Sequence, residues 1–410
     1  MNDLIHTLPQ MKSGNELISE LAIFPDYDEE IRLESPVIRL TALSDLYNLY
    51  IPSQMSLEIY SKLYLALLRS MQKKNTRIAI QQQYENRKAV KGQEYSGIIG
   101  GSDSFTIVGL SGIGKSTAIS RAITLITENR VIELEKPYTK IVPCVVVQCP
   151  FDCSVKGVLL EILRKIDEKL GSKYYQNALR ARATTDMLIG SVSQVALNHI
   201  GMLIVDEIQN VVNSKNGKSL IGALTQLINN SGISIGMIGT PECTTYFESA
   251  MQLARRSVGL QYGAMSYDEY FQSFCKVLFD YQFVVKKSKL TDAITEWLYE
   301  HSAGVASIVV SLIHDAQEIA VFTGKETLDL DALNAAYEQR LSLVHRYIEP
   351  SIQKGKSTSN TKTRNKPASI VQAEIDDKIS ISFLAEKSKA EGIDIVPLLK
   401  KYFPLLEVTI

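Results

Sequence analysis

One glycine-rich segment of the chain has the residue types and spacing of a phosphate-binding site. The sequence GLSGIGKST, from Gly109 to Thr117, follows the pattern G-x-x-x-x-G-K-[ST]. Glycines allow successive backbone N–H groups to curve around phosphate oxygens, and the N-terminus of a following helix adds a positive dipole end. Lys115 would reach the β- and γ-phosphates of a nucleotide, and the Ser116 hydroxyl would hold Mg²⁺. The predicted phosphate-binding residues are Gly109, Leu110, Ser111, Gly112, Ile113, Gly114, Lys115, Ser116 and Thr117.

A tight turn before a helix is the alternative for this segment, since glycine and serine are common in turns. Such a turn has no need for a lysine directly after the last glycine. The flanking sequence also has the order that a phosphate-binding loop requires, because the apolar run SFTIVG precedes it and the helical pattern AISRAITLI follows it. We therefore expect a strand, the loop and a helix in succession.

Two further segments end in residues that suit nucleotide hydrolysis. The apolar run MLIV is followed directly by Asp206 and Glu207. Hydrolysis needs an acid near the metal ion and a group that orients water, so we expect Asp206 to contact Mg²⁺ and Glu207 to activate water. The run ISIGMIG ends at Thr240, whose hydroxyl could lie between the γ-phosphate and the water. Acids also end ordinary strands, and a threonine before Pro241 suits a turn, but the three motifs together favour an ATPase.

The segment LARRSVG contains two arginines, Arg255 and Arg256. An arginine from a neighbouring subunit can stabilise charge in the transition state of phosphoryl transfer. A solvated basic helix end is an equally good interpretation of the same residues. The sequence leaves the role open, with Arg256 preferred if one of the two acts across an interface.

These motifs lie in an alternation of apolar runs and amphipathic segments. Continuous apolar strands between helices predict a parallel sheet that is covered by helices on both faces. After residue 264 helical patterns replace the strands, and either Asp329 or Asp331 is expected to cap the last helix. A further helix is expected over Ser56–Lys74, with Ser56 as its cap. Besides SFTIVG, the predicted strands are Lys140–Pro150, Met202–Glu207 and Ile233–Thr240.

The expected organisation is an α/β nucleotide-binding core with helical additions on both sides. Residues 351–369 are rich in Ser, Thr and Lys and contain no acidic residue, which is a linker composition. The apolar residues that return after this linker suggest a segment that docks on a partner. The expected divisions are an N-terminal helical extension (1–95), the core (96–263), a helical lid (264–350), a flexible basic linker (351–369) and a C-terminal tail (370–410).

Composition excludes several classes of protein. The net charge of the 410-residue chain is −1, so any nucleic-acid site must be a local patch. Three of the five cysteines, Cys144, Cys149 and Cys153, lie close together, but their spacing does not match a zinc site.

The odd number of cysteines suggests a reducing compartment. No signal peptide and no 18-residue apolar stretch is evident, so we expect a cytoplasmic protein without a membrane partner.

With these residues assembled, the chain resembles the TnsC/TniB group of AAA+ ATPases, which regulate DNA transposition. The resemblance covers roughly residues 40–345 and rests on GLSGIGKST, CPFDCSVKGVLLEILRKIDEKLGS, MLIVDEIQN, ISIGMIGTPE, LARRSVG and EHSAGVASIVVSLIHDAQ. It implies an AAA+ P-loop core with a helical lid. It further implies an ATPase that assembles with ATP and Mg²⁺ into a hexamer- or heptamer-like ring or filament on double-stranded DNA. The implied partners are a TniQ/TnsD-type target selector and TnsA/TnsB-type transposase subunits, and hydrolysis would disassemble the complex.

The resemblance also implies binding residues. The segment that contains Tyr50, Ile51 and Pro52 resembles a lead-in that helps to hold adenine. In the family, the DNA contacts come from the segment directly after the second strand and from the loop after the next helix. A basic stretch with interleaved tyrosines and hydroxyls agrees with this, although a solvated helix face would look similar. The implied DNA-binding residues are Lys156, Lys173, Arg180, Arg182 and Thr184.

One feature departs from the AAA+ pattern, and two other classes remain as alternatives. Many AAA+ lids contain an arginine that touches the γ-phosphate, whereas this chain has Gly304-Val305-Ala306-Ser307 at the expected place. TnsC-like lids share that absence, which leaves nucleotide sensing by the lid open. A small-molecule P-loop kinase is one alternative, although a large helical domain follows the sheet. An initiator or helicase loader is the other, although the tail looks too short for a winged helix.

Overall fold

The computed structural model describes residues 7–341, except 75, 98, 100–103, 136–137 and 250–257. The predicted linker 351–369, the predicted tail 370–410 and both arginines, Arg255 and Arg256, lie outside the described residues. The chain divides into two units, Met1–Ser351 and Ile352–Ile410, and the described residues all belong to the first. Within them, no helix has the length and apolar character needed to span a bilayer.

The predicted strands lie in one sheet with the order β2-β3-β4-β5-β1-β6. The four predicted strands are β1 (Phe105–Gly109), β3 (Tyr138–Gln148), β4 (Ile200–Asp206) and β5 (Ser234–Gly239), and these four run parallel. Two edge strands were not predicted. Parallel β6 (Val258–Tyr262) pairs with β1, and antiparallel β2 (Ile132–Glu135) pairs with β3. The sheet is therefore mixed, because β2 and β3 are too close in sequence for the crossover that parallel strands need.

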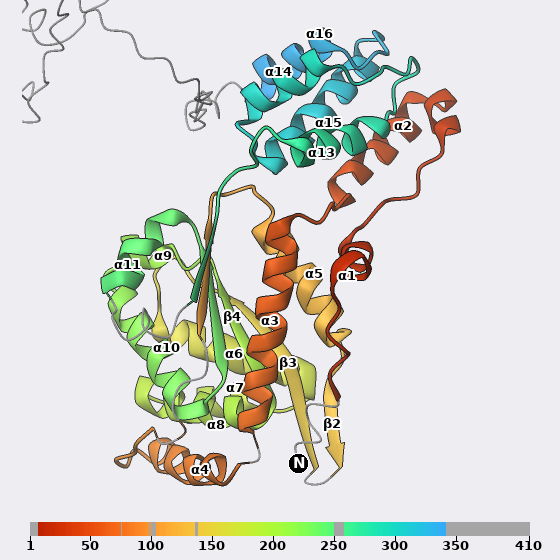
Figure 1. The fold of residues 1–410 in the computed structure, drawn as a ribbon. Helices are drawn as coiled ribbons and strands as arrows, with labels where there is room; N and C mark the ends of the chain where they lie inside the picture. The colour runs from red at the N-terminus through yellow and green to blue at the C-terminus, as the bar shows by residue number, and fades with distance from the viewer. Residues whose placement is uncertain are drawn as a thin grey trace, which may run out of the picture. The chain divides into compact units, whose positions relative to one another are not determined.

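Helices cover both faces of this sheet (Figure 1). Met202 and Ile204 of β4 pack on one face and Leu203 and Val205 on the other, so the continuous apolar sequence follows from burial of both faces. The first face is covered by α1 (Gly14–Leu21), α3 (Gln54–Lys73) and α5 (Lys115–Thr127), and the second by α6 (Val155–Leu170), α8 (Thr185–His199) and α10 (Gly217–Ser231). The remaining core elements are α4 (Arg77–Val90), α7 (Tyr174–Arg180), α9 (Asn210–Asn213), η4 (Pro241–Cys243) and α11 (Thr244–Ser249).

Helix caps show one correct and one wrong prediction. Asp329 caps the last α-helix, since its carboxylate accepts a hydrogen bond from the Ala332 N–H at 3.0 Å. The expected cap of α3, Ser56, is wrong by three residues. Ser53 is the N-cap, and Ser56 lies at the third helical position, where its Oγ accepts from the Ser53 N–H at 3.0 Å. Both serines thus form a capping box, and the helix starts directly after the Pro52–Ser53 segment.

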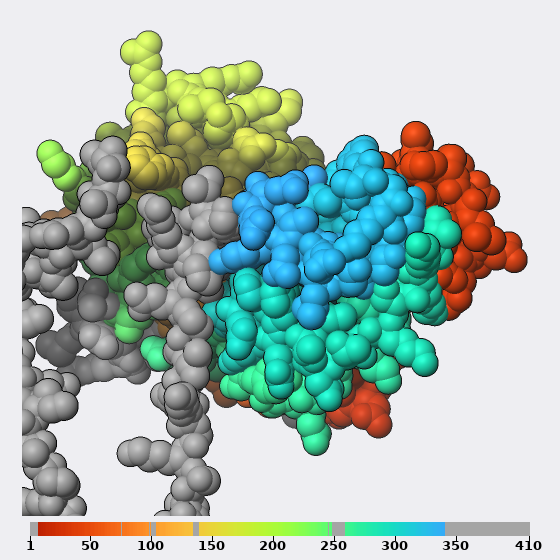
Figure 2. Space-filling view, turned by 90° about the horizontal axis from the view of Figure 1, so that it is seen from above, coloured from red at the N-terminus to blue at the C-terminus, as the bar shows by residue number. Residues whose placement is uncertain are grey.

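The C-terminal helices form a second hydrophobic core together with part of the N-terminal extension. Leu43 and Leu46 are fully buried against these lid helices, and Figure 2 shows the orange-red N-terminal segment adjoining the teal and blue lid. The lid helices are α13 (Glu269–Asp280), α14 (Asp292–Ser302), α15 (Ala306–Phe322), α16 (Leu330–Ala336) and the π-helical turn η5 (Tyr337–Leu341). The N-terminal elements on the lid are η2 (Glu29–Leu33), α2 (Pro36–Leu43) and η3 (Ser44–Asn48).

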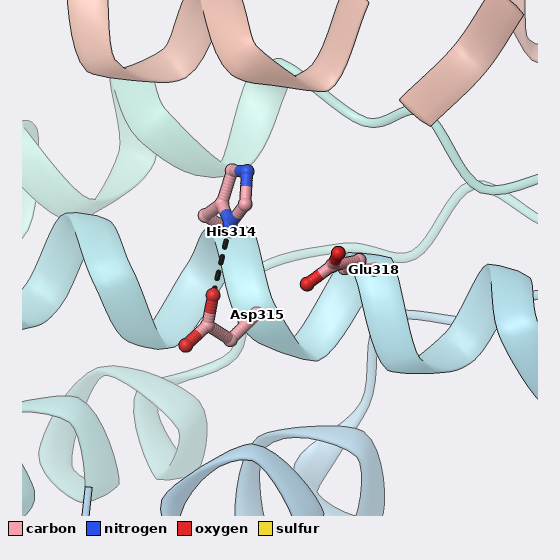
Figure 3. A group of neighbouring side chains, drawn as sticks. All are labelled: His314, Asp315 and Glu318. Atoms are coloured by element: carbon pink, nitrogen blue, oxygen red, sulfur yellow. Dashed lines mark hydrogen bonds and ion pairs between the residues drawn. The ribbon is translucent and has the colours of Figure 1, made fainter. Parts of the chain in front are cut away.

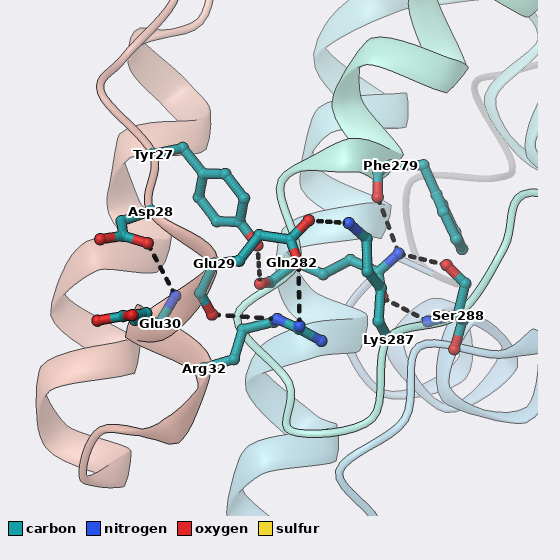
Figure 4. Close-up of polar contacts among 9 residues, drawn as sticks. All are labelled: Tyr27, Asp28, Glu29, Glu30, Arg32, Phe279, Gln282, Lys287 and Ser288. Atoms are coloured by element: carbon teal, nitrogen blue, oxygen red, sulfur yellow. Dashed lines mark hydrogen bonds and ion pairs between the residues drawn. The ribbon is translucent and has the colours of Figure 1, made fainter.

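Polar contacts hold this N-terminal segment to the lid. The Arg39 guanidinium, which is 2% exposed, forms a bidentate ion pair with the Glu326 carboxylate at 2.6 and 2.7 Å. The Tyr27 hydroxyl donates to the Gln282 carbonyl at 2.7 Å, and Lys287 pairs with Glu29 (Figure 4). Residues 27–49 are therefore part of the lid structure, while α1 and α3 on either side of this segment pack on the sheet.

Candidate nucleotide-binding site

The predicted phosphate-binding loop lies between β1 and α5, in the expected order of strand, loop and helix. Gly112 and Gly114 have φ angles of 81° and 94°, which only glycine adopts without strain. Helix α5 begins at Lys115, directly after Gly114. Backbone N–H groups and the N-terminus of α5 therefore face the same cavity, as anion binding requires.

Lys115 lies at the centre of the loop. Its side chain is 9% exposed, and the Nζ atom donates hydrogen bonds to the carbonyls of Gly109 and Leu110, both at 2.7 Å. Burial lowers the pKa of Lys115, while the nearby carboxylates of Asp206 and Glu207 act in the opposite direction. A buried cation in this place provides strong electrostatic attraction for a phosphate.

Asp206 and Glu207 lie at the carboxyl end of β4, next to this loop. The Asp206 carboxylate accepts hydrogen bonds from the Ser116 hydroxyl at 3.3 Å and from the Glu207 backbone N–H at 2.9 Å. Glu207 has a φ angle of 57°, which is uncommon for a residue with a side chain and typical of functional sites. Its exposed carboxylate accepts a hydrogen bond from the Gln209 amide.

Thr240 and Gln209 lie in the same pocket. The Thr240 hydroxyl donates to the Glu242 carboxylate at 2.6 Å, so this side chain already has a partner. The Oε1 atom of Gln209 is buried without a hydrogen-bond partner among the described residues. Buried polar atoms of this kind are rare and need an explanation. Gln209 was missed by sequence reasoning, although it follows the two acids in the segment VDEIQN.

These elements enclose one cavity of about 250 Å³. Sequence reasoning also missed Ser307, which brings the lid into contact with the loop, since its N–H donates to the Gly112 carbonyl at 3.0 Å. Ser307 lies in the first turn of α15. It belongs to the stretch Gly304–Ser307, where many AAA+ lids have an arginine and this chain has none. The cavity is lined by Ser111, Gly112, Gly114, Lys115, Ser116, Thr117, Asp206, Glu207, Gln209, Gly239, Thr240 and Ser307.

The oxygen atoms of Ser116 and Asp206 form a suitable pair for Mg²⁺. A hydroxyl and a carboxylate are hard ligands, and Mg²⁺ is usually held by one or two protein oxygens together with phosphates and water. The 3.3 Å separation of Ser116 Oγ and Asp206 Oδ2 brings both groups to one point of the cavity. The residues present therefore fit the predicted metal site.

The segment with the predicted adenine contacts crosses from the lid to the start of α3. Tyr50 forms a two-bond bridge with Ile23, and the Ile51 carbonyl accepts from the Tyr270 hydroxyl at 3.1 Å. The start of α3 reaches the phosphate-binding loop, because a Cβ atom on Gly114 would lie 4.0 Å from Met55 Cε. Tyr50, Ile51 and Pro52 precede Met55 by a few residues and are not among the residues that line the cavity, so their contact with adenine stays a prediction.

The predicted DNA-binding residues lie in two separate places. Lys156 is the second residue of α6, whereas Lys173 lies beyond the other end of this helix. Helix α6 has 16 residues, which at a rise of 1.5 Å per residue separates its ends by about 24 Å. Arg180 ends α7, and Arg182 lies in the connection to α8. These side chains are exposed, so they are accessible to DNA but do not form a single cluster.

Thr184 has a structural role that the sequence did not indicate. Its hydroxyl accepts a hydrogen bond from the Met187 N–H at 3.3 Å and thereby caps α8. Capping satisfies a backbone donor that would otherwise lack a partner. The Thr184 side chain is exposed as well, so a DNA contact by this residue is still a prediction.

A group of acidic residues and a histidine on α15 resembles a metal site in composition only. His314, Asp315 and Glu318 lie close together (Figure 3). The Arg340 guanidinium forms ion pairs with both carboxylates, at 3.0 Å to Asp315. The cluster is therefore a salt-bridge network that joins α15 to η5, in which the Arg340 guanidinium offsets part of the negative charge of the two carboxylates.

The comparison with protein families agrees with the motifs. A family model described as bacterial TniB protein matches residues 101–261. No curated protein sequence matches the chain. Similar solved structures include Aeropyrum pernix ORC1 in complex with DNA, at 15% identity over 66% of this chain and 67% of that chain, with a TM-score of 0.42. Drosophila ORC bound to DNA shows 12% identity over 98% and 86% of the two chains, with a TM-score of 0.45. Domain III of Thermotoga maritima DnaA shows 13% identity over 64% and 92%, with a TM-score of 0.34.

A sheet with a phosphate-binding loop after β1, paired acids after β4 and a helical lid in contact with the loop defines an AAA+ P-loop protein. Residues 101–261 match the TniB family model, so the predicted resemblance to TnsC/TniB transposition ATPases is confirmed over this core.

Proposed function

We propose that the protein is an ATP-dependent, DNA-binding regulator of transposition. It binds ATP with Mg²⁺, assembles on double-stranded target DNA, connects a target-selection protein to the transposase, and leaves the DNA after hydrolysis. The observation that supports this best is the convergence of Lys115, Ser116, Asp206 and Glu207 on one cavity in a TniB-type core.

The cavity residues suit phosphoryl transfer to water. Lys115 and the loop N–H groups would bind the phosphates, and Ser116 and Asp206 would hold Mg²⁺, which would supply positive charge to the phosphate oxygens. Glu207 accepts a proton from the attacking water, and Thr240 lies where its hydroxyl can contact the water or the γ-phosphate. Gln209 orients the Glu207 carboxylate through their hydrogen bond.

Assembly would complete the site. Arg256, or Arg255, would enter the cavity of a neighbouring subunit and stabilise the transition state. The adenine would lie near Tyr50, Ile51 and Pro52, in the segment that crosses between lid and core. Lys156, Lys173, Arg180, Arg182 and Thr184 would contact the phosphates of the duplex.

The segment 370–410 is proposed to dock the transposase, because apolar residues return there after a linker. Deleting residues 370–410 should preserve ATP-dependent DNA binding and abolish capture of the transposase subunits. Unchanged capture in a pull-down with purified transposase would contradict this role.

Electron microscopy of the protein with duplex DNA tests the proposal. Samples with and without a non-hydrolysable ATP analogue should differ, with rings or filaments on DNA only when the analogue is present. Monomers in both samples would contradict assembly and favour a small-molecule kinase. Assemblies that form equally without nucleotide would contradict the regulatory use of ATP.

A further inference from the structure

Two surface segments lie side by side where β3 and β4 end. One is the β3–α6 turn with the first two residues of α6 (residues 149–156), and the other is the α9–α10 loop with the first two residues of α10 (residues 214–218). The Asp152 carbonyl accepts hydrogen bonds from Ser214 Oγ at 2.9 Å and from Asn216 Nδ2 at 3.0 Å. Asn210 Nδ2 also donates to the Cys149 carbonyl at 2.8 Å. The two segments therefore form one continuous surface, the turn–loop surface.

Both segments have fixed backbones. A Cβ atom on Gly217 would lie 2.2 Å from the Val211 carbonyl oxygen, so the loop closes tightly around this glycine. In the turn, the Cys153 N–H donates to the Pro150 carbonyl at 2.9 Å, and the sulfurs of Cys149 and Cys153 are buried 3.7 Å apart. A fixed backbone lowers the conformational entropy that side chains on it lose when they bind a partner.

The side chains on this surface are cationic and aromatic. Phe151 is 84% exposed at the tip of the turn, and Lys156, Lys215 and Lys218 are exposed around the two segments. None of the three ammonium groups has an ion pair or hydrogen bond with a residue that the structure describes. The Asp152 carboxylate supplies an opposite charge, and it accepts a hydrogen bond from the Ser154 N–H.

We propose that Lys215, Lys218 and Phe151 are DNA-contacting residues, which extend the interface at Lys156 across the α9–α10 loop. This inference rests on the proposed function. The two lysines neutralise backbone phosphates, and the Phe151 ring packs on the apolar edge of a deoxyribose. Duplex DNA fits better than an acidic protein, because the cations are unpaired and spread around a single aromatic tip rather than an apolar face.

The position of the surface also links DNA to hydrolysis. The segment from Glu207 to Lys218 contains the catalytic base at one end and the new lysines at the other. Asn210 between them holds the β3–α6 turn, and the Cys149 N–H donates to the Asp206 carbonyl at 2.8 Å. DNA bound on this surface therefore contacts the same short segment that positions the catalytic carboxylates.

The test compares the double variant Lys215→Ala/Lys218→Ala with a matched control, Lys276→Ala/Lys289→Ala, which removes two exposed lysines from the lid region. Fluorescence anisotropy of a labelled duplex is measured over a salt series with a non-hydrolysable ATP analogue. The slope of log affinity against log salt, per protomer, should become shallower by about 1.8 in the test variant and stay unchanged in the control. Phe151→Ala should weaken binding several-fold at every salt concentration without changing the slope.

The outcomes separate this inference from the proposed function. If the wild-type protein binds DNA and the test variant has the control's slope, the lysines do not contact phosphate and the inference is wrong. If the test variant instead loses self-association in sedimentation without DNA, the surface faces another copy of the chain, which also overturns it. Failure of the wild-type protein to bind duplex DNA would overturn the proposed function itself. Equal binding of the ATP analogue by all variants verifies that they are folded.

Discussion

The nucleotide pocket and the turn–loop surface lie at the carboxyl ends of neighbouring strands, but they are built differently. In the pocket, buried Lys115 donates two hydrogen bonds, and Asp206 accepts from both Ser116 and the Glu207 backbone. On the turn–loop surface, Lys215 and Lys218 are exposed and have no partner among the described residues. Polar groups of the pocket are oriented before a ligand arrives, whereas the surface cations are oriented by the ligand.

This difference has consequences for how substitutions act. Removing one oriented group from the pocket should cost much, because each group acts at close range on the bound phosphates and is held in place before they bind. Removing one surface cation should cost little, because phosphate contacts are screened by salt and each is one of many. The two regions can therefore be distinguished by the size and the salt dependence of mutational effects.

The largest effect is expected for Lys115→Ala. The variant loses the cation that holds the phosphates, and with it at least two charged hydrogen bonds of about 1.5–3 kcal/mol each. ATP affinity should fall about 100-fold or more, as measured by titration calorimetry. Lys276→Ala, which removes an exposed lysine of α13, is the control and should bind ATP normally. An ATP affinity of Lys115→Ala within a few-fold of the wild-type value would show that the pocket is not organised around this residue.

Glu207→Gln should separate binding from hydrolysis. The amide keeps the shape of the side chain but cannot accept the proton of water, so the rate of phosphate release should fall about 10²–10⁴-fold. ATP affinity should remain that of the wild type, and complexes on DNA should dissociate much more slowly. A normal hydrolysis rate in the variant would assign the base to another residue.

A smaller effect is expected for Gln209→Leu, which keeps the side-chain volume and removes the amide that contacts Glu207. If Gln209 orients the base, kcat should fall about tenfold while KM stays constant, since only the transition state is affected. Steady-state phosphate release at several ATP concentrations measures both constants. A rise in kcat would instead mean that Gln209 restrains Glu207 and that its release activates the enzyme.

The pocket could be predicted from the sequence because its residues belong to short, continuous segments. Lys115 and Ser116 follow a glycine pattern, and Asp206 and Glu207 follow an apolar run, so a strand end and a loop suffice to place them. Strand β6 was not predicted, because VGLQY is short and contains a glycine and a glutamine. Ser307 lies far along the chain, and its place in the pocket follows from the packing of the lid.

The turn–loop surface could not be predicted, since its contacts join residues more than sixty positions apart. The segment NSKNGKS around Lys215 resembles any polar loop, and only the bonds from Ser214 and Asn216 to Asp152 place it beside Lys156. The predicted DNA-binding residues already fall in two segments of the sequence, and α6, which lies between these segments, separates Lys156 from Lys173 in space. The sequence does not indicate that Lys215 and Lys218 lie beside the first of these segments, because that position depends on how the loops pack.

The smallest effects should come from single cations, and they can resolve which of the two predicted DNA sites is used. Lys156→Ala removes one phosphate contact next to the turn–loop surface, so the per-protomer salt slope should become shallower by about 0.9 for all DNA sequences alike. Lys173→Ala tests the site at the other end of α6 in the same way. Because most of the length of α6 lies between the two positions, contacts at both sites should give additive effects in the double variant. If only Lys156→Ala changes the slope, DNA binds at the turn–loop surface and not at the other end of α6. Lys173 at the start of α7 would then belong to a solvated helix face.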